Sequence, residues 1–80
     1  MTITLLAFGI AKDIVGKQKL VVIKKNPATV ASLRTSLKKS YPKLGDIPHL
    51  MIAVNNKYAK DTDKLHTNDE VALIPPTNGG

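Results

Sequence analysis

The chain has 80 residues, no cysteine, and twelve basic against six acidic residues, for a formal net charge of +6. A chain of this length forms one domain and buries only about 60% of its unfolded surface, which leaves no room for a cleft between domains. The lack of cysteine excludes a disulfide framework, a thiolate metal site and a cysteine nucleophile. We therefore expect a cytoplasmic domain, without a membrane span because every apolar run is short.

The first third of the chain predicts two strands joined by a short helix. Residues 2–8 first alternate between polar and apolar side chains and then become apolar, as in a strand with one face in a core. Ile10 and Ile14 lie four residues apart, with Val15 beside them and Gly16 as a helix stop, which predicts a short helix whose apolar side contacts that strand. Residues 18–25 carry a β-branched run and predict a second strand, antiparallel to the first.

The middle of the chain predicts the main helix. Thr29 follows a strand-breaking Asn-Pro pair and can cap the start of the helix. The apolar side chains that recur on one helical face are Val30, Leu33, Leu37 and Tyr41. Pro42 ends the helix, and residues 43–49 are expected to form a loop.

The last third predicts three strands. Residues 50–54 are an apolar run, and Asn55 and Asn56 supply a tight turn into a short strand near Tyr58. Residues 70–74 form the final strand, which Pro75 and Pro76 end because neither can donate to a sheet ladder. This order of elements favours an α+β domain with one long helix over a mixed sheet.

The internal side chains do not predict catalysis or metal binding. His49 and His66 are far apart in the sequence, and neither has a cysteine or an acidic cluster at ligand spacing. Two working carboxylates need a pocket that drives their pKa values apart, and the sequence shows no such arrangement. We expect surface histidines, solvated acids and no metal.

The positive charge is typical of nucleic-acid-binding proteins, but the composition argues against that function. Base recognition and stacking use arginine and aromatic side chains, whereas the chain has one arginine and three aromatic residues beside eleven lysines. We interpret the lysines as a solvated surface that steers an acidic protein partner. A basic RNA-binding module stays open as an alternative of another class.

Chemistry is instead expected at Gly79 and Gly80. A carboxylate becomes reactive once a partner converts it with ATP into an acyl-adenylate, after which sulfur yields a thiocarboxylate and an amine yields an isopeptide. Glycine enters a narrow channel and does not hinder attack on its carbonyl. Pro75 and Pro76 stiffen the exit from the last strand, so residues 77–80 are expected to project as a flexible tail from a domain of residues 1–76.

These residues resemble the small sulfur-carrier subunits of molybdopterin synthase, in a family that also holds the thiamine-pathway sulfur carriers. The resemblance spans nearly the whole chain and is most specific over residues 68–80, with their strand, proline pair, two variable residues and terminal glycines. Residues 8–16 resemble the first turn and short helix of the family, and residues 53–55 its central strand and turn. The implied fold is a ubiquitin-like β-grasp: a mixed sheet of four to five strands, a main helix across one face and a short helix after the first strand.

The resemblance implies a sulfur carrier that is not an enzyme on its own. Gly80 would be adenylated by a ubiquitin-activating-type enzyme that uses ATP. It would then receive sulfur that originates from cysteine, through a sulfurtransferase or cysteine desulfurase, to form a C-terminal 1-thioglycine. No cofactor is expected to stay bound. The tail would enter the large subunit, whose catalytic side chains convert cyclic pyranopterin monophosphate into the dithiolene of molybdopterin.

The implied complex is a heterotetramer with two small subunits at the ends of a large-subunit dimer. The expected partner-binding residues are Phe8, Leu73, Pro75, Pro76, Thr77 and Asn78. Two alternatives share the activating chemistry: a thiamine-pathway-type carrier and a ubiquitin-like protein modifier. The proline pair and the short helix before Gly16 favour the molybdopterin branch.

Overall fold

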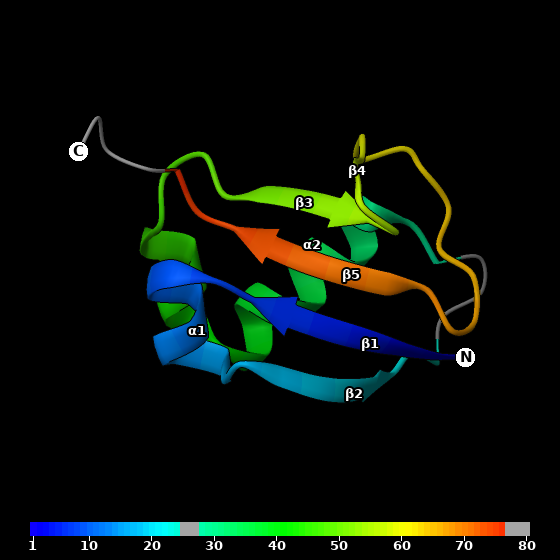
Figure 1. The fold of residues 1–80 in the computed structure, drawn as a ribbon, viewed down its shortest axis with the longest axis horizontal. Coiled ribbons are helices and arrows are strands. Elements are labelled where there is room, and N and C mark those ends of the chain that lie inside the picture. Colours follow the sequence, from blue (N-terminus) through cyan, green and yellow to red (C-terminus); the bar gives the residue numbers. More distant parts are fainter. Residues whose placement is uncertain (25–27, 77–80) are drawn as a thin grey trace.

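The computed structural model describes residues 1–24 and 28–76, which form a five-stranded mixed sheet with a helix behind one face (Figure 1). The strands are β1 (Thr2–Ala7), β2 (Gln18–Val22), β3 (Met51–Val54), β4 (Lys57–Tyr58) and β5 (Glu70–Ile74). The helices are α1 (Gly9–Val15), α2 (Val30–Ser40) and the 3-10 helix η1 (Pro42–Asp46). The predicted α+β arrangement is confirmed.

The order across the sheet is β2-β1-β5-β3-β4. β1 and β5 are parallel neighbours, and the other neighbouring strands are antiparallel. The first and last strands of the chain therefore lie side by side near the middle of the sheet, as Figure 1 shows in blue and orange. Within the described residues, no helix combines the length and the apolar character that crossing a bilayer requires.

Burial alternates along the strands and gives the sheet a covered face and an open face. The side chains packed between the sheet and α2 are Ile3, Leu5, Ala7, Ile52, Val71 and Leu73 from the strands and Val30, Leu33 and Leu37 from α2. Full burial of such a side chain contributes about 1.5–3 kcal/mol. The covered face therefore holds most of the hydrophobic stabilisation, as the alternating and helical apolar patterns predicted.

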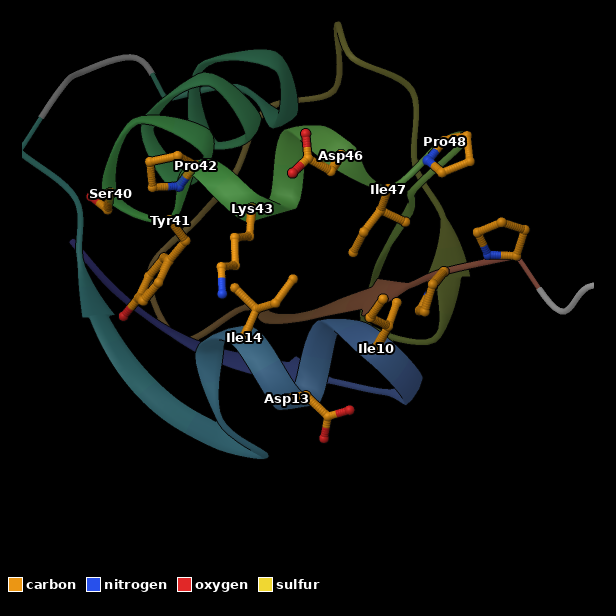
Figure 2. A pocket seen from close by; sticks show the side chains of 12 residues that line it. Ile10, Asp13, Ile14, Ser40, Tyr41, Pro42, Lys43, Asp46, Ile47 and Pro48 are labelled. Atoms are coloured by element: carbon orange, nitrogen blue, oxygen red, sulfur yellow. The ribbon is translucent and has the colours of Figure 1, made fainter.

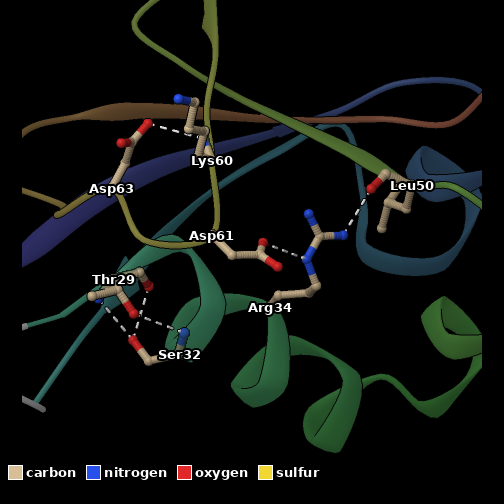
Figure 3. A network of polar contacts seen from close by, with 7 residues as sticks. All are labelled: Thr29, Ser32, Arg34, Leu50, Lys60, Asp61 and Asp63. Atoms are coloured by element: carbon tan, nitrogen blue, oxygen red, sulfur yellow. Dashed lines mark hydrogen bonds and ion pairs between the residues drawn. The ribbon is translucent and has the colours of Figure 1, made fainter.

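A reciprocal capping box starts α2. Ser32 N–H donates to Thr29 Oγ1 at 3.2 Å, and Thr29 N–H donates to Ser32 Oγ at 2.9 Å (Figure 3). The two bonds satisfy backbone donors that have no partner within the helix. The predicted cap at Thr29 is confirmed, with a serine in the place where glutamate or glutamine is usual.

Arg34 ties α2 to two loops. Its Nη1 donates to the carbonyl oxygen of Leu50 at 2.7 Å, and its Nε lies 3.4 Å from Asp61 Oδ1 (Figure 3). Because these contacts occupy the guanidinium group, the single arginine of the chain acts in the fold.

The predicted contact side of the short helix is confirmed in part. Val15 is buried and Ile14 is half-buried against the core, whereas Ile10 is 56% exposed and Ala11 is buried in its place. The pairs Ile10–Ile14 and Ala11–Val15 share the spacing of four residues, so periodicity alone could not choose between them.

The segment after α2 is more regular than the predicted loop. Pro42 ends α2 as expected, but it also starts η1, since the fixed φ of proline suits the first helical position. Leu44 of this helix is buried and closes one end of the core.

The predicted asparagine turns are confirmed. Asn55 and Asn56, with φ of 51° and 70°, join β3 to β4, and Asn68 has φ of 69° before β5. Asparagine tolerates this left-handed region better than most residues.

Candidate functional site

The end of β5 is the place where the predicted tail leaves the sheet. Phe8 N–H donates to the carbonyl oxygen of Leu73 at 3.2 Å, which joins the end of β1 to the end of β5. A Cβ atom on Gly9 would lie 3.1 Å from Pro75 Cγ, and Gly9 has a positive φ of 54°. Glycine accommodates both the conformation and the close approach. The first turn of the chain therefore fixes the position of Pro75.

The predicted partner-binding residues have different positions in the fold. Phe8 is 51% exposed, Pro75 is half-buried and Pro76 is exposed. Leu73 is 0% exposed, so the prediction of a surface docking role for it is wrong. Its place in β5 turns the side chain toward α2, beside Ala7 and Ile52. The remaining predicted site residues, Thr77, Asn78, Gly79 and Gly80, lie outside the described residues.

The open face of the sheet carries an apolar surface at this end. The register places Leu6 beside Ala72, and Ile74 beside Met51, with all four side chains away from α2. A shallow pocket of about 280 Å³ lies here. Its lining residues, which we call the open-face pocket, are Leu6, Phe8, Ala53, Asn56, Tyr58, Glu70, Ala72 and Ile74.

Most of the open-face pocket was missed from the sequence, although one signal was present. Glu70 is charged and exposed at the start of β5. Because side chains alternate along a strand, an outward Glu70 places Ala72 and Ile74 on the same open face and Leu73 on the covered one. Phe8 alone was identified correctly as an exposed apolar residue.

A second depression, which we call the α1–η1 groove, lies between α1 and η1 (Figure 2). It is on the other side of the chain exit, the point after Ile74 where the chain leaves the sheet. It measures about 750 Å³, and Pro75 and Pro76 line it. Figure 2 shows Ile10 and Ile14 of α1 facing Ile47 across the space. Ile10 and Ile14 thus line a surface groove, although Ile14 also packs against the core. The strand β5 ends between two apolar surfaces.

Every buried side-chain nitrogen and oxygen atom in the described part of the chain has a hydrogen-bond partner. Asp69 Oδ1 accepts from Asn55 Nδ2 at 2.9 Å, and Asp69 Oδ2 accepts from His66 N–H at 2.7 Å. These bonds hold the turn before β5. No group of three or more potential metal-ligating side chains occurs among residues 1–24 and 28–76. The arrangement can present apolar surfaces around a chain exit; within those residues it does not assemble a metal site.

Sequence comparison gives matches along the whole chain. The model of the ThiS family matches residues 5–80. A molybdopterin synthase sulfur carrier subunit of Dictyostelium discoideum is 34% identical over 80 residues, covering 95% of this chain and 93% of that protein. A protein of the same name from Caenorhabditis briggsae is 34% identical over 83 residues, covering 100% and 99%.

Structure comparison gives the same fold. SAMP1, a small archaeal modifier protein of Haloferax volcanii, superposes with a TM-score of 0.83 at 22% identity, and both chains are covered completely. In the complex of subunits 1 and 2 of the molybdopterin-converting factor from Helicobacter pylori, the matching chain superposes with a TM-score of 0.70 at 21% identity, again with complete coverage of both chains. The predicted ubiquitin-like β-grasp fold is confirmed.

Proposed function

The chain belongs to the ThiS family, and we propose that it is the sulfur-carrier subunit of a molybdopterin synthase, acting in molybdenum cofactor biosynthesis. The observation that carries this proposal is the near-complete match, in both directions, to relatives named for that role. The family match also includes Gly79 and Gly80, the residues to which the sequence assigns the chemistry.

The proposed chemistry takes place at the C-terminal carboxylate of Gly80. A carboxylate oxygen attacks the α-phosphorus of ATP on an activating enzyme, so that an acyl-adenylate forms and pyrophosphate leaves. The terminal sulfur of a persulfide on a sulfurtransferase or cysteine desulfurase then attacks the carbonyl carbon, and AMP leaves with the bonding electrons. A thiol cleaves the S–S bond of the resulting acyl disulfide and is itself oxidised to a disulfide. The product is the thiocarboxylate. Its sulfur attacks a side-chain carbon of the pterin substrate in the large subunit and displaces an oxygen substituent from it, which leaves a thioester between Gly80 and the pterin. Water then cleaves the acyl–sulfur bond, so that the sulfur stays on the pterin and the carboxylate of Gly80 is restored.

In this proposal the described residues form the surface that partner proteins recognise. The open-face pocket and the α1–η1 groove flank Pro75 and Pro76 on two sides. Exposed apolar surface of this kind is typical of docking sites. The large subunit would cover it while receiving the tail and would supply the catalytic side chains, in a heterotetramer of two small and two large subunits.

A second candidate function is conjugation to lysine, as in a ubiquitin-like modifier. The structural similarity to a protein named as a small archaeal modifier supports conjugation as a second candidate. The same acyl-adenylate would lead to an isopeptide if an amine took the place of sulfur. A thiamine-pathway-type carrier would share the sulfur chemistry and differ in the acceptor.

The test is intact mass spectrometry of the purified full-length chain. After incubation with ATP, an activating enzyme and a sulfur donor, we expect the mass increase of one oxygen-to-sulfur exchange. Addition of the large subunit and cyclic pyranopterin monophosphate should reverse it and yield molybdopterin. Sulfur loading without this discharge would favour a thiamine-type carrier. Covalent conjugates without loading would favour the modifier, and no change under conditions that load a known carrier would reject all three.

A further inference from the structure

The net positive charge of the chain is concentrated in one segment. Residues 14–45 contain eight of the twelve basic residues and none of the six acidic ones. The remaining residues therefore have four basic and six acidic side chains. The basic segment includes β2, which forms an edge of the sheet, and α2, which lies behind the sheet (Figure 1).

The free edge of β2 offers backbone groups for another strand. Met1 and Ile23 exchange two backbone bonds, at 2.8 and 3.3 Å, and Ala7 N–H donates to Lys17 O at 3.1 Å. Alternation along an antiparallel pair then turns the N–H and C=O groups of Lys19 and Val21 toward β1. Those of Gln18, Leu20 and Val22 point outward, and no described strand pairs with them.

A groove of about 500 Å³ runs beside this edge, between β2 and α2. Its apolar lining comes from Val21, Ile23, Leu33 and Leu37, together with Tyr41. On α2, the residues that line it at intervals of four are Ser32, Ser36 and Ser40. Their short side chains leave space beside the strand. An added strand would turn every second side chain into this groove.

The other side of an added strand would also meet apolar residues. Leu20 is 72% exposed and Val22 is 66% exposed, both on the open face. A strand paired with β2 would cover them with its remaining side chains. The geometry therefore suits an aliphatic segment that is apolar on both faces.

Lysines surround the groove. Lys19 and Lys24 line it, and Lys17 is exposed next to Gln18. Lys19 Nζ contacts the Tyr41 hydroxyl and lies 4.8 Å from the ring centroid, while exposed Lys39 lies three residues after Ser36. None of the described residues that line the groove is acidic. Acidic residues beside the aliphatic segment would complement this charge.

We propose that the β2 edge and the β2–α2 groove bind an extended aliphatic segment with acidic flanks from another protein, which adds as a sixth strand. Main-chain bonds to β2 provide affinity, and the aliphatic and acidic side chains provide specificity. The site is separate from the open-face pocket and the α1–η1 groove except for Tyr41 and Ser40, which line both grooves. A partner could thus hold the carrier from its helix side while the chain exit stays accessible.

The same features favour a peptide over nucleic acid. A row of alternating backbone donors and acceptors pairs with another backbone, whereas nucleic-acid surfaces draw on arginine and stacking aromatics. The single arginine is bound to Leu50 and Asp61. Tyr41 is half-buried against Lys19.

The test uses a synthetic fluorescent peptide with alternating valines and isoleucines followed by consecutive glutamates, added to the full-length protein. We expect saturable binding, with NMR shift changes confined to β2 and α2. Ser36→Glu should weaken binding about tenfold, since it places a negative charge in the groove. Thr35→Glu is the matched control: it makes the same charge change at an exposed position that does not line the groove, and it should bind nearly as the wild type does.

A second pair of variants tests the backbone pairing. Val22→Pro removes one outward N–H and is tolerated on an edge strand, so it should also weaken binding about tenfold. Val22→Thr keeps the N–H and should bind normally. The thermal midpoint of each variant checks the fold.

Three results would overturn the proposal: no saturable binding, equal weakening by both glutamate variants, or NMR shift changes at the open-face pocket. So would tighter binding of single-stranded RNA that Val22→Pro leaves unchanged.

Discussion

The two faces of the sheet are built from the same strands, yet a helix covers only one of them. Leu73 lies on the covered face with 0% exposure, and its neighbour Ile74 lies half-buried on the open face. The covered face therefore stabilises the fold, and the apolar residues of the open face remain accessible. Exposed apolar surface in a domain with so small a core supports our proposal that the open face contacts other proteins.

The largest expected effect compares neighbouring residues of β5. Leu73→Ala should lower the free energy of unfolding by about 3 kcal/mol, because it leaves a cavity between the sheet and α2. Ile74→Ala should lower it by about 1 kcal/mol or less, since that side chain is already partly solvated. Urea denaturation measures both. Equal losses would mean that the two faces do not differ in their contribution to stability.

The next effect concerns function on the open face. Phe8→Glu should slow sulfur transfer to the pterin by about tenfold, because a charge desolvated in the docked complex costs more than about 1.4 kcal/mol. Its thermal midpoint should barely change, as Phe8 is half-exposed. Leu20→Glu is the matched control, on the same face but at the distant β2 edge. If Leu20→Glu slowed transfer equally, the docking surface would not be local to the chain exit.

A smaller effect is expected where the two faces meet at the chain exit. Gly9→Ala should destabilise the fold by about 1–2 kcal/mol, since alanine at positive φ is strained and its Cβ would approach Pro75. Gly45→Ala is the control, with no positive φ and open space around the site. Thermal unfolding compares the two variants. A neutral Gly9→Ala would show that Gly9 does not restrict the position of Pro75.

Local patterns predicted most of the fold. The Thr29 cap, the asparagine turns and the strand-ending prolines were identified because each depends on neighbours in the sequence. For α1, Ile14 and Val15 contact the core as predicted, whereas Ile10 is exposed, because the pair Ile10 and Ile14 has the same spacing as the buried pair Ala11 and Val15. Only the packing of α1 against the ends of β1 and β5 distinguishes them.

The site was less predictable than the fold. Phe8 and the proline pair could be identified from their position and chemistry. Tyr58 joins the open-face pocket through pairing of β4 with β3, and the contact of Gly9 with Pro75 joins residues far apart in the chain. Such contacts depend on strand register, which no local pattern contains.

The most direct test of the proposed carrier role is the intact mass of a variant that lacks Gly80, treated with ATP, activating enzyme and sulfur donor beside the wild type. We predict sulfur loading of the wild type and none of the variant, with nearly equal thermal midpoints because the described core ends at Leu73. Sulfur loading of the variant would contradict the account. If the variant failed to load only because its domain had unfolded, the result would contradict the claim that Gly80 carries the chemistry without stabilising the fold.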